Sequence, residues 1–245
     1  MPGERSDLGG AVRRSLEMSL SRMHLDRVDV FQLHNQVEAD EPISPRRLTL
    51  REVTGPRGVL EAMHKLKEEG LVGAIGVTGI ARHDAVRQLL EDTRLATVQL
   101  VTNVLCSEGE MGARGDTPYR DHLAMVKRAS AAGLGVFGIR PFAAGSLTSG
   151  IDRQLPDDHP VAVDFGLAQR ELGFLTSETA GSMAIAAMRY ALTVPGVSTV
   201  VTGAKNRVEL AEAVQAANSG PLPAAIMERI ASWQKSRATA NVVTV

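Results

Sequence analysis

The sequence predicts an α/β fold in which helices cover a parallel β-sheet. Helical and strand patterns alternate along nearly the whole chain, and the strands are continuously apolar, which is typical of parallel strands buried on both faces. The length of 245 residues and the composition, 44% hydrophobic and 22% charged, are those of one soluble globular unit. Because no repeat or linker divides the chain, we expect a single domain over residues 1–245.

The first pair of elements is a helix followed by a strand. Apolar residues spaced by four and three predict an amphipathic helix over residues 7–23, with Asp7 as its N-cap. Residues 28–33 are β-branched and apolar, so they predict a mostly buried strand that ends at His34. A polar loop that contains prolines follows.

Two further units repeat this alternation. A helix over residues 58–69, ended by Gly70, leads into a strand over residues 72–77. A helical pattern around residues 86–90 then leads into a strand over residues 97–102.

The second half of the chain continues in the same order. After a long loop, a helix around residues 123–129 is ended by Gly133, and a strand covers residues 134–139. A long segment with several glycines and prolines leads to the remaining elements. These are a helix through Met183, Ala187 and Leu192, a strand over 198–201, a helix over 208–217, and an amphipathic helix with Leu222, Ile226, Ile230 and Trp233.

Five strands fit either an open sheet or part of a barrel. The dinucleotide-binding motif G-x-G-x-x-G is absent, and we attribute Gly73 and Gly76, inside a strand, to close backbone packing. The loops at 141–146 and 202–207, after the last two strands, hold small residues. Small residues let backbone N–H groups approach an anion, and the second loop adds basic residues and an expected helix cap, Asn206. Both loops therefore suit a phosphorylated ligand, as in many barrel enzymes. Ordinary glycine-containing turns are the alternative interpretation.

Composition excludes several classes of function. The 27 basic and 28 acidic residues are not clustered, so neither a nucleic-acid nor a membrane surface is favoured. We expect a cytoplasmic protein, since no run is long enough for a transmembrane helix and the first residues lack a signal peptide's apolar core. The single cysteine, Cys106, excludes an internal disulfide, and the scattered histidines predict no metal site.

Ordered motifs along nearly the whole chain resemble one family. They are RSLEMSL at 14–20, DRVD at 26–29, QLHN at 32–35, EGLVGAIGV at 69–77, VQ at 98–99, RPF at 140–142, PGV at 195–197 and VTGA at 201–204. In order and spacing they resemble the aldo-keto reductases. The resemblance implies a (β/α)8 TIM barrel, here incomplete, whose strands four to eight are the five parallel strands of this chain. It also implies NADP as cofactor and hydride transfer between the nicotinamide and an aldehyde, ketone or sugar.

The resemblance also implies site residues. His34 matches the family histidine that orients the substrate, and it follows a strand at the end where barrel enzymes keep their chemistry. The matched cofactor positions are Thr78 and Gln99 at the nicotinamide amide, Gly145 and Ser146 at the pyrophosphate, and Lys205 and Arg207 at the adenosine 2′-phosphate. Phe142, Gly203 and Asn206 are further expected cofactor-binding residues, and Arg140 replaces the family's aromatic residue beside the nicotinamide ring, where it could lie against the ring or form an inward salt bridge.

Other family positions have no match. The family's Asp, Tyr and Lys lie in earlier motifs that this chain lacks, and neither Tyr119 nor Tyr190 stands in such a motif. Nor do the five lysines, which are Lys65, Lys67, Lys127, Lys205 and Lys235. We therefore expect that an N-terminal part of the barrel is missing and that the chain reduces carbonyls weakly. The alternative is a non-enzymatic nucleotide-binding or interaction protein that self-associates through uncovered strand edges.

Overall fold

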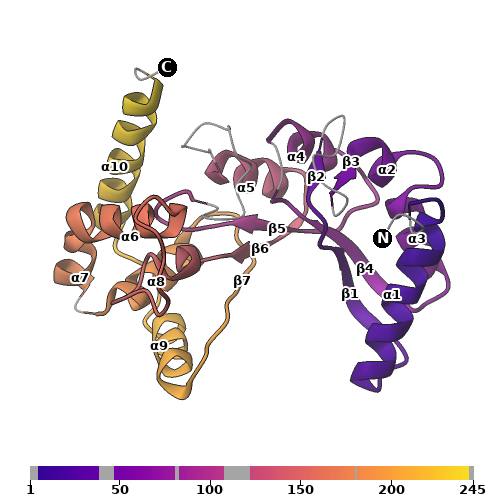
Figure 1. Cartoon of the computed structure of the whole chain (residues 1–245), viewed down its shortest axis with the longest axis horizontal. Coiled ribbons are helices and arrows are strands. Elements are labelled where there is room, and N and C mark those ends of the chain that lie inside the picture. Colours follow the sequence, from indigo (N-terminus) through magenta and orange to yellow (C-terminus); the bar gives the residue numbers. More distant parts are fainter. Residues whose placement is uncertain (1–4, 39–46, 81–82, 108–121, 180, 243–245) are drawn as a thin grey trace. The chain divides into compact units, whose positions relative to one another are not determined.

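The structure, a computed structural model, describes residues 5–38, 47–80, 83–107, 122–179 and 181–242 (Figure 1). It contains one five-stranded sheet in which the strands follow the order β1-β4-β5-β6-β7. Their bounds are β1 Val28–Leu33, β4 Val72–Thr78, β5 Thr97–Val101, β6 Gly135–Ile139 and β7 Thr199–Val201. The pairs β1·β4, β4·β5 and β6·β7 are parallel. Each strand therefore lies beside the next one in sequence, which confirms the predicted α/β class and is the strand order of part of a barrel.

The chain forms two compact units. One comprises residues 1–99 and 128–136, and the other comprises residues 100–127 and 137–245. The prediction of a single domain stays a prediction.

The helices of the first unit pack against one another and against its strands (Figure 1). They are α1 Leu8–Met23, α2 Leu50–Thr54, α3 Val59–Glu68 and α4 His83–Leu89, with a short parallel pair β2 Val37–Glu38 and β3 Leu48–Thr49. Asp7 caps α1 as predicted, since its carboxylate accepts from the backbone N–H of Gly10 at 2.8 Å. Gly70 ends α3 at φ 80°, also as predicted. Sequence reasoning missed β2, β3 and α2.

The strands of the first unit have two unlike faces. Register partners in parallel strands point to the same side, so Leu33 and Val77 share one face, which is apolar and buried. Gln32, Gly76 and Thr97 share the other face, which is small and polar. Gly73 confirms the predicted close packing, because a Cβ there would lie 2.7 Å from the backbone oxygen of Asp29.

The remaining helices follow α4 along the chain. They are α5 His122–Ala131, the 3₁₀ turn η2 Ala143–Gly145, α6 Pro160–Glu171, α7 Gly173–Thr179, α8 Met183–Thr193, α9 Arg207–Asn218 and α10 Ala224–Val242. The long segment after β6 was predicted without helices, yet it contains α6 and α7. Pro160, one of the prolines of that segment, occupies the first turn of α6, where proline is tolerated.

A buried amide ties α10 to the second unit. Gln234 is 4% exposed and donates from Nε2 to the backbone oxygen of Val104 at 2.8 Å and to the hydroxyl of Tyr190 at 3.0 Å. Tyr190 is thus a core residue of α8.

Two kinds of feature are not found among the described residues. None of their helices is long and apolar enough to cross a membrane. No group of three or more His, Cys, Asp or Glu side chains in this part of the chain could hold a metal ion.

Candidate functional site

Polar side chains gather at the carboxyl ends of β1, β4 and β5. His34 follows β1, Thr78 is the last residue of β4, and Gln99, in β5, is the register partner of Thr78. One row back, Gln32 and Thr97 flank Gly76. All of them lie in the first compact unit.

Hydrogen bonds join these side chains into one continuous row. Gln32 Nε2 donates to Thr97 Oγ1 at 3.0 Å, and Gln99 Nε2 donates to Gln32 Oε1 at 2.5 Å. Thr78 Oγ1 donates to Gln99 Oε1 at 3.5 Å, and His34 Nδ1 lies 3.2 Å from Thr78 Oγ1. We call these five residues the polar row.

Gly76 makes the polar row geometrically feasible. Gln32 and Thr97 lie on strands separated by β4, roughly 9–10 Å apart at two strand spacings. A Cβ at Gly76 would lie 2.1 Å from Thr97 Oγ1 and 3.0 Å from Gln32 Nε2. The missing side chain therefore leaves the space in which the two side chains meet over β4.

The polar row runs from the sheet interior to solvent. Thr78 and Thr97 are buried, Gln32 and Gln99 are partly buried, and His34 is exposed. The imidazole thus has one nitrogen held by the protein, while the ring is accessible to a ligand.

The loop after β6 has an unusual backbone. Arg140, Ala143 and Ala144 have φ of 55°, 47° and 59°, and Gly145 has φ of 103°. Non-glycine residues rarely adopt such angles, so surrounding contacts have to hold them. The Asn103 amide is one such contact, since it donates to the backbone oxygen of Arg140 at 3.0 Å.

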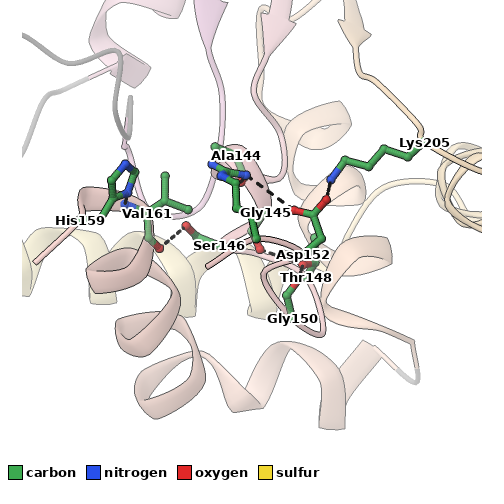
Figure 2. A network of polar contacts seen from close by, with 10 residues as sticks. Ala144, Gly145, Ser146, Thr148, Gly150, Asp152, His159, Val161 and Lys205 are labelled. Atoms are coloured by element: carbon green, nitrogen blue, oxygen red, sulfur yellow. Dashed lines mark hydrogen bonds and ion pairs between the residues drawn. The ribbon is translucent and has the colours of Figure 1, made fainter. Parts of the chain in front are cut away.

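Side chains of this loop turn inward. Ser146 is fully buried and its hydroxyl donates to the backbone oxygen of Val161 at 2.9 Å (Figure 2). Thr148 Oγ1 bonds the backbone oxygens of Gly145 and Gly150. Phe142 packs against the buried residues Ile185, Met188 and Ala216. The loop is thus held in place by its own contacts.

The loop after β7 caps α9 and carries an ion pair. Asn206 Oδ1 accepts from the N–H groups of Val208 and Glu209 at 2.9 and 3.0 Å, which confirms the predicted cap. The Glu209 carboxylate accepts from the backbone N–H of Lys205 at 2.7 Å. The Lys205 ammonium pairs with Asp152, from the segment after β6 (Figure 2). This contact lowers the pKa of Asp152 below its usual value.

The second unit has the room and charge for a phosphorylated group. A Cβ at Gly145 or Gly203 would meet no atom within 4 Å, so open space lies beside both glycines. Lys205 and Arg207 are exposed at the start of α9. These residues fit a nucleotide cofactor, although Glu209 already occupies an anion position at this helix end.

Sequence reasoning missed two further polar groups. Gln32 was interpreted only as part of a strand, although it stands two residues before His34, on the same strand face. Ser107 donates to the carboxylate of Asp164 in α6, and burial raises the pKa of that carboxyl. No sequence signal pointed to Asp164, because α6 itself was not predicted.

Comparisons with known proteins agree on one family. The model described as "Aldo/keto reductase family" matches residues 5–235. The chain is 26% identical over 208 residues to the L-galactose dehydrogenase of Arabidopsis thaliana, covering 84% of this chain and 57% of that protein. The chain thus spans less than two thirds of that relative's length.

Solved structures show the same fold. The aldo-keto reductase AKR11C1 from Bacillus halodurans, in its apo form, has a TM-score of 0.64 and 22% identity, covering 91% of this chain and 68% of that chain. The glycerol dehydrogenase AKR11B4 from Gluconobacter oxydans has a TM-score of 0.65 and 18% identity, covering 91% and 63%. The five-stranded parallel sheet therefore corresponds to part of the fold of these proteins.

Proposed function

Because the chain belongs to the aldo/keto reductase family, we propose that it functions in NADP-dependent hydride transfer with an aldehyde, ketone or sugar. The polar row carries this proposal, because it joins an exposed imidazole to two groups suited to an amide ligand. When bound, the nicotinamide would supply the hydride chemistry.

At the nicotinamide end, Gln99 and Thr78 would bind the carboxamide. The Gln99 carbonyl oxygen has a second lone pair beside the one that faces Thr78, and so can accept from a ligand amide. His34 would orient the substrate, since its ring is exposed at the end of β1. Arg140 and Phe142 would support the ring side of the cofactor from the loop after β6.

At the phosphate end, the open space beside Gly145 and Gly203 supports a pyrophosphate and adenosine site. Ser146 would contribute as part of the loop backbone, because its hydroxyl is bonded to Val161. Asn206 would hold the start of α9, and Lys205 and Arg207 would bind a 2′-phosphate. Lys205 would then share its charge between that phosphate and Asp152.

The substrate class and location are further proposals. The curated relative's name gives L-galactose as its substrate, which supports a sugar for this chain. A near-neutral charge and no transmembrane pattern support the cytoplasm.

We expect the 245-residue chain to reduce carbonyls weakly. The phenol of Tyr190 is buried and bonded to Gln234, so it is not available as a proton donor to a ligand, and Tyr119 lies outside the described residues. Since Tyr190 is the one tyrosine in the described part of the chain, that part offers no accessible phenol to protonate the alkoxide formed by hydride transfer.

Titration of the purified chain with NADPH and NADH, followed by nicotinamide fluorescence, tests the cofactor. We expect Lys205→Ala to weaken NADPH binding roughly tenfold, because losing a charge-assisted hydrogen bond costs about 1.5 kcal/mol. NADH binding should not change. Lys67→Ala, in exposed α3 sequence, is the matched control. Absence of NADPH binding by the unaltered chain would overturn the proposal.

A panel of aldehydes with NADPH tests the activity. Turnover that disappears in His34→Ala would contradict the expectation of weak reduction.

A second candidate function is self-association or partner binding without catalysis. The observation that favours it is exposed apolar surface on both edge strands and on nearby helices of each unit. These side chains are Val30 in β1, Met18 and Met23 in α1, Val201 in β7, and Val208, Leu210 and Val214 in α9.

A further inference from the structure

We infer that the polar row fixes the proton of neutral His34 on Nδ1, so that Nε2 is a hydrogen-bond acceptor and the site selects a substrate that presents a hydroxyl group. This inference rests on the proposed function for its substrate, but its first half concerns only the chain's own hydrogen bonds.

The direction of the row follows from the two glutamines. Gln99 Nε2 donates to Gln32 Oε1, so Gln99 turns its own carbonyl oxygen toward Thr78. A carbonyl oxygen can only accept, and the Thr78 hydroxyl has a single proton. That proton therefore lies on the Gln99 side of Thr78.

The tautomer of His34 follows from Thr78. With its proton directed at Gln99, Thr78 Oγ1 presents lone pairs to His34 Nδ1 at 3.2 Å. Two lone pairs would repel there, so Nδ1 has to carry the proton. A neutral imidazole has one N–H, which leaves Nε2 without a proton.

The row has only two self-consistent directions. If one glutamine amide turned alone, two oxygens or two NH₂ groups would face each other between Gln32 and Gln99. Both amides must turn together, which would reverse every bond as far as His34. The structure has the direction in which Gln32 donates to Thr97 and Gln99 donates to Gln32.

The substrate consequence concerns the exposed side of the ring. A bare Nε2 accepts a hydrogen bond from a hydroxyl group, whereas a carbonyl oxygen, which also only accepts, would face it lone pair to lone pair. The neutral site therefore matches an alcohol or a cyclic hemiacetal better than a free aldehyde or ketone. A sugar in its ring form offers such a hydroxyl.

The ¹⁵N NMR signals of the histidine rings test the inference directly. The protonated and bare ring nitrogens have well-separated chemical shifts, and at alkaline pH, with all imidazoles neutral, the tautomer is read without any cofactor. Loss of one set of signals in His34→Gln assigns that ring.

Three variants test whether the hydrogen bonds of the polar row, and not a general change in structure, determine the tautomer of His34. Thr78→Val removes the acceptor, so we expect the Nδ1–H preference to be lost. Thr78→Ser keeps the hydroxyl and should keep the preference. Gln32→Glu supplies only acceptors, so Gln99 still donates to residue 32, and the Nδ1–H tautomer should persist.

A dominant Nε2–H tautomer in the unaltered protein would overturn the inference, and so would a tautomer that Thr78→Val leaves unchanged. If a variant fails to fold, the spectrum of the unaltered protein still decides which tautomer His34 adopts. Failure here would leave NADPH binding untouched, so it is distinguishable from failure of the proposed function.

Discussion

At the residue scale, the candidate site depends on Gly76, because this residue has no side chain. Gly76 lies between Gln32 and Thr97 and provides the space in which they meet. The polar row therefore requires a glycine at position 76 of β4.

Gly76→Ala should therefore destabilise the protein. The new Cβ would lie 2.6 Å from the backbone oxygen of Thr97 as well as 2.1 Å from its hydroxyl, so the strands have to shift. Overpacking of this kind costs about 1–3 kcal/mol, measurable as a lower urea midpoint. Gly150→Ala is the control, since a Cβ there meets no atom within 4 Å. An equal effect of both substitutions would contradict this explanation.

Asp152 provides a pH-dependent prediction. The hydrogen bond from Lys205 lowers the pKa of its carboxyl, so the pair is intact above the ordinary carboxyl range, and its contribution is lost as the pH falls through the lowered value. A ¹³C titration of the Asp152 carboxyl should give a pKa below 3.8. Lys205→Ala should return it toward that value. An unchanged titration in the variant would rule out this ion pair in solution.

The identity of the site residues could be predicted only in part. His34, Thr78 and Gln99 could be placed together because they stand at or near the ends of successive parallel strands, and family motifs marked them. Their connection through Gln32 could not, because a hydrogen bond across an intervening strand depends on rotamers and on the space at Gly76.

At the element scale, the strands and longer helices were predictable from hydrophobic periodicity and glycine caps. The predicted strand over residues 28–33 and the helix cap at Asp7 agree with the structure. The helices α6 and α7 were missed because prolines and glycines precede them. The short helix α2 was missed because five residues are too few to show a period.

A local signal for α2 does exist. Thr49 and Glu52 form a capping box, in which Thr49 Oγ1 accepts from the N–H of Glu52 at 3.1 Å and Glu52 accepts from the N–H of Thr49 at 2.7 Å. Thr49→Ala should cost about 0.5–2 kcal/mol in unfolding free energy, and Thr49→Ser should cost much less. Equal losses in urea denaturation would show that the methyl group of Thr49, and not its cap, matters.

At the scale of the whole molecule, edge strands and their helices expose apolar side chains. Val30 in β1 is 37% exposed and Val201 in β7 is 49% exposed. Parallel sheets ordinarily have both faces covered, and an open edge strand can pair with another chain, so exposed apolar side chains on these edge strands favour association.

Size-exclusion chromatography with light scattering tests this association. We expect the unaltered chain to form larger species as its concentration rises, and we expect Val30→Lys and Val201→Lys to shift it toward the monomer, because a charge at a strand edge opposes pairing. Val163→Lys, at a position in α6 that is 54% exposed, should have no effect. A monomer at all concentrations would exclude self-association.

The buried amide of Gln234 has a practical consequence for protein engineering. It donates to Val104 and Tyr190 from near the end of the chain, so removing α10 would remove the hydrogen bonds that join this helix to the β5–α5 segment and to α8. A truncation before residue 234 would remove the Gln234 hydrogen bonds, whereas a tag appended after Val242 would keep them.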